Sequence, residues 1–322
     1  LVGSEMCIRD RVHADASKSK AISYKRLFKL EKQLQVEVEE LLALSERENG
    51  QELLEGLDIA EELSFRQERL TNLTRAKAVL EMRAEERYQA KKAEYEAKLR
   101  EREEKAKRTG QKPRGRKPKP PKRGPRDKDQ YNFTDPESRI MKNSANSGFD
   151  QHYNTQVAVD QDSFLIVANT LSNHPTDRNE ALPTLDALPE EVGKPKAGAL
   201  DAGYFSEHNI AEMEGRGIEP YIATGREPHH RSWKARFAEL PAPPPEDATP
   251  KVKMAYKLRT EIGQAIYKLR KSTVEPVIGI IKEVLGFRQF SLRGLAAAAG
   301  EWCLVCLAFN LKRLHIVLAE QI

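Results

Sequence analysis

The run Lys-Ala-Gly-Ala-Leu-Asp-Ala-Gly-Tyr-Phe-Ser, residues 196–206, decides the fold that we expect for this chain. Its apolar stretch 197–200 predicts a short buried strand that Asp201 closes. Gly203 permits a tight turn, and Ser206 is placed to cap a following helix. A carboxylate at the carboxyl end of a buried strand is where an α/β sheet presents a group to its substrate. Asp201 is therefore a candidate site residue, and the alternative is an ordinary turn residue.

A second carboxylate, Glu275, lies in a stretch with Tyr267, Arg270 and Lys282. This stretch, Tyr-Lys-Leu-Arg-Lys-Ser-Thr-Val-Glu-Pro-Val-Ile-Gly-Ile-Ile-Lys-Glu, and the Leu-Asp-Ala-Gly-Tyr-Phe-Ser run together resemble the DDE-type transposases of bacterial insertion sequences. The runs at 135–143, 152–160 and 300–315 resemble them too, so the resemblance extends from about residue 12 to residue 314, apart from a charged middle section.

The resemblance implies an RNase H-like catalytic domain that holds Mg²⁺, or Mn²⁺, with three carboxylates. It makes Asp201 and Glu275 the second and third of these and so metal ligands. Tyr267, Arg270 and Lys282 match the family's signature around the Glu, in which the basic residues hold phosphates. Four residues separate Arg270 from Glu275 where the commonest form of the signature has three, so Lys271 could take the Arg role instead.

The first catalytic Asp is expected to be absent. Residues 12–23 resemble the remnant that follows the first catalytic strand, and in that register the Asp would fall at Ile8. Asp10 is two positions away, which we interpret as chance. Residues 1–11 match nothing in the family pattern, so we expect a non-native leader there and a missing first strand.

Residues 24–104 predict a helical hairpin, possibly a coiled coil, inserted into the catalytic domain. The first helix is expected over 24–44, ended by Asn49-Gly50, and the second over about 53–102. The apolar positions that recur at helical spacing are Leu27, Leu30, Leu34, Val38 and Leu41 in the first helix, and Leu63, Leu70, Leu73, Leu80 and Tyr88 in the second.

A basic arm follows at 105–130. Eleven of the twenty-two residues from 105 to 126 are Lys or Arg and none is acidic, which predicts a flexible arm that contacts DNA phosphates. Arg114, Arg116 and Lys117 lie in a run that resembles an AT-hook, except that Lys117 stands where that motif has Pro. A solvated linker is the alternative.

Residues 131–322 predict the catalytic core. Strands are expected at 153–159, 163–169, 197–200 and 219–223, with helices from 176 or 177 to 188, over 207–214, over 253–285 with a kink at Pro276, and over 296–318. The fold class is therefore α/β, an RNase H-like mixed sheet with helices on both faces, interrupted by the hairpin and the disordered basic arm.

Composition limits the other classes. Three cysteines give no disulfide framework, and Cys303-x-x-Cys306 lies in an apolar helical run without a second ligand pair, which favours core cysteines. Charged residues interrupt the apolar stretch 295–318, so a buried or docking helix is expected rather than a membrane span.

We expect a transposase fragment that acts on double-stranded DNA, both the terminal repeats and the target, as a homodimer in a synaptic complex. It would be cytoplasmic and nucleoid-associated, and the loss of the first Asp would impair it. Two other interpretations stay open: a non-catalytic DNA-binding relic, and another RNase H-fold nuclease such as a resolvase. Metal-dependent nicking would separate the first from a transposase, and joining of the cut end to a target would separate the second.

Overall fold

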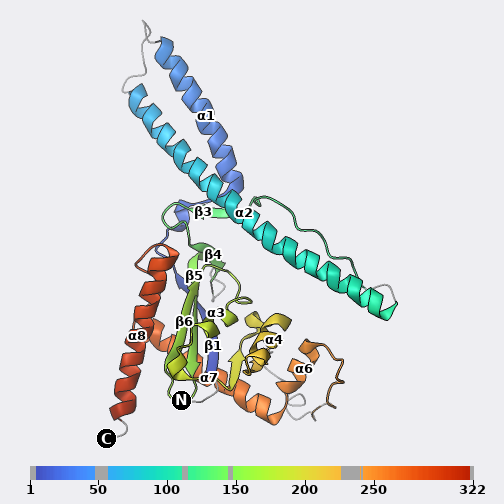
Figure 1. The fold of residues 1–322 in the computed structure, drawn as a ribbon. Helices are drawn as coiled ribbons and strands as arrows, with labels where there is room; N and C mark the ends of the chain where they lie inside the picture. The colour runs from blue at the N-terminus through green and yellow to red at the C-terminus, as the bar shows by residue number, and fades with distance from the viewer. Residues whose placement is uncertain are drawn as a thin grey trace. The chain divides into compact units, whose positions relative to one another are not determined.

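The computed structural model describes residues 5–47, 57–110, 115–143, 148–225, 240 and 242–319, and for residues 5–10 it describes the backbone alone. The chain forms two compact units (Figure 1). The sheet unit comprises residues 1–18 and 137–322, and the hairpin unit comprises residues 19–136.

The sheet unit contains a mixed sheet with the strand order β4-β5-β1-β7-β8, in which β6 also pairs with β5. The strands are β1 (Glu5–His13), β4 (Arg139–Lys142), β5 (Phe149–Asp160), β6 (Ile166–Ser172), β7 (Ala197–Leu200) and β8 (Glu219–Ile222). β5 runs antiparallel to β1, β4 and β6, whereas β1, β7 and β8 run parallel to one another. The strands expected around 153–159, 163–169, 197–200 and 219–223 are present as β5, β6, β7 and β8, and β4 was not predicted.

The expected absence of a first strand is corrected by the structure. Residues Glu5–His13 form β1, which lies between β5 and β7. Its register pairs Ile8 with Val157 on β5 and Cys7 with Leu200 on β7. Strand pairing uses backbone N–H and C=O groups, so a segment without the family's residues can still occupy this place in the sheet.

Helices cover both faces of the sheet. They are α3 (Ala181–Asp186), α4 (Glu207–Gly215), α6 (Pro250–Lys257), α7 (Glu261–Gly279) and α8 (Leu295–Ala319). Successive residues of a strand point to opposite faces, and accordingly Val157 belongs to the apolar core with α7 and α8, whereas Ala158 belongs to the core with α3, α4 and α6.

The long helix expected over 253–285 is broken, but not at Pro276. Thr260 interrupts it by capping α7, with its side chain accepting a hydrogen bond from the Gly263 N–H at 3.1 Å. Pro276 lies inside α7, which continues into a π-helical turn at Ile280–Val284. A side-chain cap starts a new helix outright, whereas a proline removes one backbone donor.

Of the described helices, α8 alone has the length and composition of a membrane span. One side of it packs in the core through Trp302, Cys306 and Phe309. The Asn310 amide donates to the Ile166 carbonyl and accepts from the Ile166 N–H, both at 2.8 Å. These contacts are those of a helix docked on the edge strand β6, as the sequence predicted.

The hairpin unit is built on α1 (Tyr24–Arg47) and α2 (Ile59–Thr109). Two ion pairs link them, Glu37 with Arg66 at 2.9 Å and Glu31 with Lys77 at 2.8 Å. The residue numbers of the paired positions fall along α1 as they rise along α2, so the helices are antiparallel. Both predicted helices are therefore present, although α2 starts later and ends later than expected; Asn49-Gly50 lies outside the described residues, and coiled-coil geometry stays a prediction.

The first and last segments of the hairpin unit lie side by side. β2 (Ala21–Ser23) and β3 (Gln130–Asn132) form a separate two-stranded antiparallel sheet. The Phe133 N–H extends this pairing by donating to the Lys20 carbonyl at 3.1 Å. Ile22 and Tyr131 of these strands join the apolar core between α1 and α2.

The expectation of a free basic arm is corrected for residues 115–128, which return along α2. Arg123 pairs with Glu85 at 2.8 Å and Arg87 pairs with Asp129 at 2.7 Å. The Arg102 guanidinium donates to the Gly115 carbonyl at 3.2 Å. The composition of the arm gave no sign of these contacts, because the partners Glu85, Arg87 and Arg102 all lie on α2, outside the arm.

Candidate active site

Asp201 stands at the carboxyl end of β7, as the sequence predicted. All four residues of β7 are buried. Asp201 then ends the strand and caps the short 3₁₀ helix Ala202–Tyr204, because its carboxylate accepts a hydrogen bond from the Ala202 N–H at 2.8 Å. The side chain is half-buried, so it is held by the turn and still reaches the surface.

Buried polar side chains hold the turn that carries Asp201. The Tyr204 hydroxyl donates to the Gln156 side chain, and the Gln156 amide donates to Asn154 at 3.1 Å. Asn154 in turn donates to the Asp177 carboxylate at 3.0 Å. Each of these four residues is at most 3% exposed. The network therefore connects the turn to β5 and to the segment before α3.

Sequence reasoning missed this network. It placed position 177 only at the start of a predicted helix. The signal was available in β5, where Asn154 and Gln156 lie on the opposite face from Tyr153 and Val157, which belong to the core with α7 and α8. Polar side chains on one face of a buried strand need hydrogen-bond partners, and this pattern indicates a buried polar site.

A second charged contact lies beside the network. His174 Nδ1 and Glu180 Oε1 are 2.7 Å apart, and the carbonyl of His174 accepts from Asn154 at 3.1 Å. The hydrogen bond with Glu180 raises the pKa of His174. This contact joins the two ends of the segment 174–180, which contains Asp177.

Glu275 lies on α7, and its side chain is exposed. Its neighbours Val274 and Val277 are buried in the core that includes Tyr153 and Phe290. α7 packs against β1, β7 and β8. The two candidate carboxylates therefore sit on neighbouring elements, Asp201 at the end of β7 and Glu275 on the helix that packs on β7.

The other predicted residues of α7 and its continuation have distinct surroundings. Arg270 is only 6% exposed, and its Nε has no hydrogen-bond partner among the described residues. Its guanidinium lies 5.3 Å from the centre of the Tyr267 ring. Lys282 Nζ is 3.5 Å from the Arg11 carbonyl oxygen of β1. Arg270 and Lys282 thus bring two cations to the side of the sheet on which α7 packs.

The position of the expected first carboxylate can be located by register. Cys7 and Leu200 are the last paired residues of β1 and β7, so Ile8 and Asp201 are the positions that follow. Isoleucine has no atom that can bind a metal. Among the described residues, no group of three His, Cys, Asp or Glu is placed to hold a metal ion.

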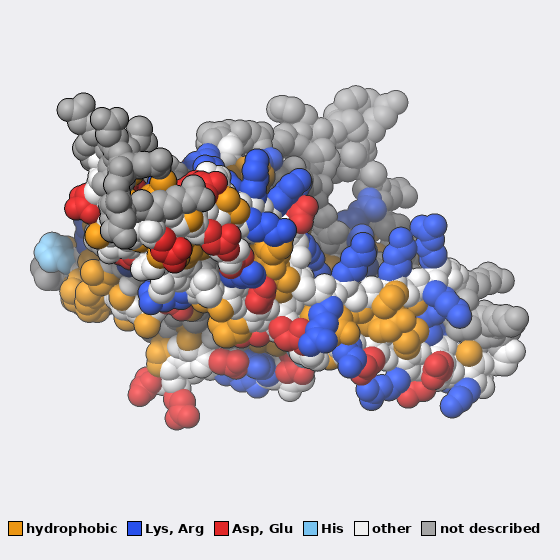
Figure 2. All heavy atoms as spheres, turned by 90° about the horizontal axis from the view of Figure 1, so that it is seen from above, with side chains coloured by type: hydrophobic (Ala, Val, Ile, Leu, Met, Phe, Trp, Pro, Cys, Tyr) orange, Lys and Arg blue, Asp and Glu red, His pale blue; other side chains and the backbone are white. Residues whose placement is uncertain are grey.

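The predicted DNA-contacting residues of the arm belong to the hairpin unit. Arg116 and Lys117 are exposed. Arg114 lies outside the described residues. The space-filling view shows many Lys and Arg side chains on the surface of the molecule (Figure 2).

Comparison with known proteins gives one match. No curated protein and no solved structure matches the chain. Residues 245–315, however, match the family model described as the transposase DDE domain. The matched segment includes α7 with Glu275, Arg270 and Tyr267, and it includes Lys282, whereas Asp201 precedes it. This match supports the assignment of the chain as a DDE-type transposase.

Proposed function

We propose that this chain is a transposase, of the kind that cuts DNA at the ends of an insertion sequence and joins the cut end to target DNA, and that Ile8 at the place of the first Asp impairs the cutting. The observation that carries the proposal is the match of residues 245–315 to the transposase DDE domain. The strand order supports the RNase H-like form of the fold, because β1 has the antiparallel strand β5 on one side and the parallel strands β7 and then β8 on the other. Homodimerisation in a synaptic complex and a place in the bacterial cytoplasm at the nucleoid belong to the same proposal.

Each proposed site residue has a chemical role. Asp201 and Glu275 supply carboxylate oxygens, the ligands that Mg²⁺ prefers. Arg270 and Lys282 supply positive charge for a DNA phosphate, and the guanidinium suits a phosphate because it can donate two parallel hydrogen bonds. Tyr267 holds one face of the Arg270 guanidinium, so it positions that cation.

The family generally uses divalent metals, but the donor set of this chain does not fit such a centre. Two metal ions are commonly held by three or more acidic residues. Here Ile8 stands at the place of the third carboxylate, and the described part of the chain has no group of three potential ligands. This disagreement favours a second candidate function, a DNA-binding protein that no longer cuts.

Restoring the third carboxylate tests both candidates. We expect Ile8→Asp to nick plasmid DNA that carries the element's ends when Mg²⁺ is added, whereas the unaltered chain binds the same DNA without nicking it. Adding Asp201→Ala or Glu275→Ala to Ile8→Asp should abolish nicking and leave DNA binding unchanged.

A matched control is Glu283→Ala, which removes an exposed carboxylate that pairs with Arg288 instead. Nicking should survive this change. The assignment of the site is wrong if the Asp201→Ala or Glu275→Ala chain cuts as fast as its parent. If the Ile8→Asp chain binds DNA and never cuts it, the DNA-binding relic is the better description.

A further inference from the structure

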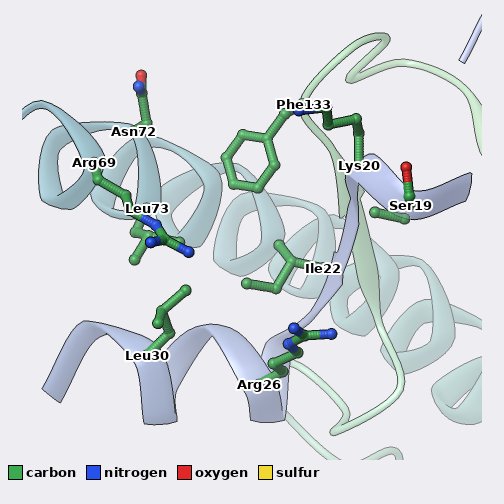
Figure 3. A pocket seen from close by; sticks show the side chains of 10 residues that line it. Ser19, Lys20, Ile22, Arg26, Leu30, Arg69, Asn72, Leu73 and Phe133 are labelled. Carbon is green, nitrogen blue, oxygen red and sulfur yellow. The ribbon is translucent and has the colours of Figure 1, made fainter. Parts of the chain in front are cut away.

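The hairpin unit contains a pocket of about 450 Å³ that the proposed active site does not use. It lies between α1, α2 and the β2–β3 sheet (Figure 3). Its lining combines an apolar part with a set of polar and basic side chains. The apolar part is Ala21, Ile22, Leu30, Leu73 and Phe133, and the polar part is Ser19, Lys20, Arg26, Arg69 and Asn72. The volume falls within the range of about 300–1,000 Å³ that is usual for sites of small ligands.

An exposed aromatic ring forms one wall of this pocket. Phe133 is 41% exposed although it adjoins the apolar core of the unit. It is held in place by its backbone hydrogen bond to Lys20 and by an edge-to-face contact with Tyr131, with ring centroids 5.3 Å apart. In Figure 3 the Phe133 ring and the Arg69 guanidinium point toward the same space. A fixed ring with a free face is a surface on which a nucleobase can stack.

The cations of the pocket form no ion pair with an acidic residue of the described chain, although Arg69 interacts electrostatically with Glu37. No acidic residue lines the pocket, and no hydrogen bond or ion pair joins the side chains of Lys20, Arg26 or Arg69 to any described residue. Elsewhere in the same hairpin the basic residues Arg66 and Lys77 pair across the helices. The pocket therefore concentrates positive charge that no direct ion pair within the described part of the chain neutralises, which favours an anionic ligand.

We propose that this pocket binds one unpaired nucleotide of a DNA strand, with the base on Phe133 and the phosphates against Lys20, Arg26 and Arg69. The inference rests on the DNA-binding part of the proposed function. A base within a duplex cannot reach such a ring, so the nucleotide must be in a single strand or turned out of the stack. An acidic peptide would also meet the charge, but it would leave the free face of Phe133 without a stacking partner.

The test measures binding of a fluorescently labelled oligothymidylate of twenty nucleotides by anisotropy, over a series of salt concentrations, with the whole chain. For Arg26→Ala with Arg69→Ala we expect affinity to fall at least about tenfold at low salt. The slope of log K against log salt should shrink by about 1.4, since each phosphate contact contributes about 0.7 on single strands.

Phe133→Ala separates stacking from charge. It should weaken binding roughly tenfold with the salt slope unchanged, because stacking on an aromatic side chain involves no counterion release. Lys29→Ala with Arg75→Ala is the matched control: it removes two positive charges from the same two helices, outside the pocket. Binding by this control should stay within about twofold of the unaltered chain.

Three outcomes would overturn the inference. The first is unchanged binding by both pocket variants, and the second is an equal loss in the control. The third is capture of a labelled Glu-rich peptide that displaces the oligonucleotide from the unaltered chain. The nicking assay distinguishes failure of this inference from failure of the proposed function. If the Ile8→Asp chain cuts DNA while its pocket variants bind the oligonucleotide normally, only the nucleotide-binding role of the pocket is refuted. If the pocket variants lose binding and the Ile8→Asp chain does not nick DNA, only the proposed cleavage activity is refuted.

Discussion

At the scale of single residues, the turn after β7 depends on Gly203. A Cβ atom at this position would lie 2.4 Å from an Asp177 carboxylate oxygen and 3.3 Å from its Cγ. Asp177 cannot easily move aside, since it is buried and hydrogen-bonded to Asn154. The sequence suggested only that Gly203 permits a tight turn. The closer reason, a neighbouring carboxylate from a segment some 25 positions earlier, could not be predicted from local sequence.

We expect Gly203→Ala to lower the free energy of unfolding by about 1–3 kcal/mol, since it forces an overpacked contact. Urea denaturation followed by circular dichroism measures this. Gly215→Ala is the matched control, because a Cβ there meets nothing within 4 Å. Equal stability of the two variants would show that the contact with Asp177 is not restrictive.

His152 is the second residue whose surroundings predict a measurable effect. It is buried on β5, its ring lies 4.3 Å from that of His13, and its Nδ1 donates to the Asp150 carbonyl at 2.9 Å. Burial lowers its pKa to about 4, and His13 adds to this effect. The neutral ring is therefore favoured in the folded protein, while the unfolded chain takes up a proton near pH 6.5.

Stability should therefore fall as the pH drops from about 6.5 to about 4, because the unfolded state binds more protons in this range. The loss attributable to His152 is up to about 3 kcal/mol. In the His152→Gln variant, the free energy of unfolding should decline less over this range, by a similar amount. Urea denaturation at pH 7, 5.5 and 4.5 measures this for both proteins. If the two proteins lose stability equally with pH, His152 has the same pKa in the folded and unfolded states.

At the scale of elements, α7 presents Glu275, Arg270 and Tyr267, and its start depends on close backbone packing. A Cβ at Gly263 would lie 1.9 Å from the Lys257 carbonyl oxygen at the end of α6. Helical periodicity predicted a single helix here, because both α6 and α7 carry apolar residues toward the core. The break at Thr260 depends on this close approach, which no pattern of hydrophobicity reveals.

We expect Gly263→Ala to destabilise the protein by roughly 3 kcal/mol or more, since the atoms that it meets are backbone and cannot rotate away. Gly279→Ala, at the other end of α7, meets nothing within 4 Å. It should stabilise the helix by about 0.5–1 kcal/mol, because alanine loses less entropy than glycine on folding. Thermal unfolding of the two variants compares them directly. If Gly263→Ala were neutral, α6 and α7 would have to be separated more widely than the structure has them.

At the scale of the whole molecule, the sequence predicted the helices of both units, with α6 and α7 taken as one, and four of the eight described strands, β5 to β8. It did not predict the two-stranded sheet of β2 and β3, whose strands are three residues each and lie more than 100 positions apart. Nor did it predict that residues 115–128 lie along α2. Pairings between distant short segments leave no local pattern, and the ion pairs of Arg87 and Arg123 involve ordinary surface residues. The candidate carboxylates were identified through family resemblance, whereas the network that holds Asp201 required the structure.

The hairpin unit should fold as a separate protein. A chain of residues 19–136 has its own apolar core, with Leu27, Leu34, Leu73 and Leu80 buried between the helices. We expect a helical circular dichroism spectrum and a cooperative thermal transition. Leu73→Ala should lower the free energy of unfolding by about 2–5 kcal/mol, because it creates a cavity in this core. A gradual transition that is unaffected by Leu73→Ala would contradict the prediction.

The pairing of β2 with β3 also has a consequence for how this protein can change over evolutionary time. Because the two strands return the chain to the point at which it left, the helices beyond them can lengthen, shorten or be exchanged without moving the strands of the larger sheet. Selection can therefore act on the hairpin unit and on the sheet unit independently. The same junction gives an engineer a defined place to graft a different helical module.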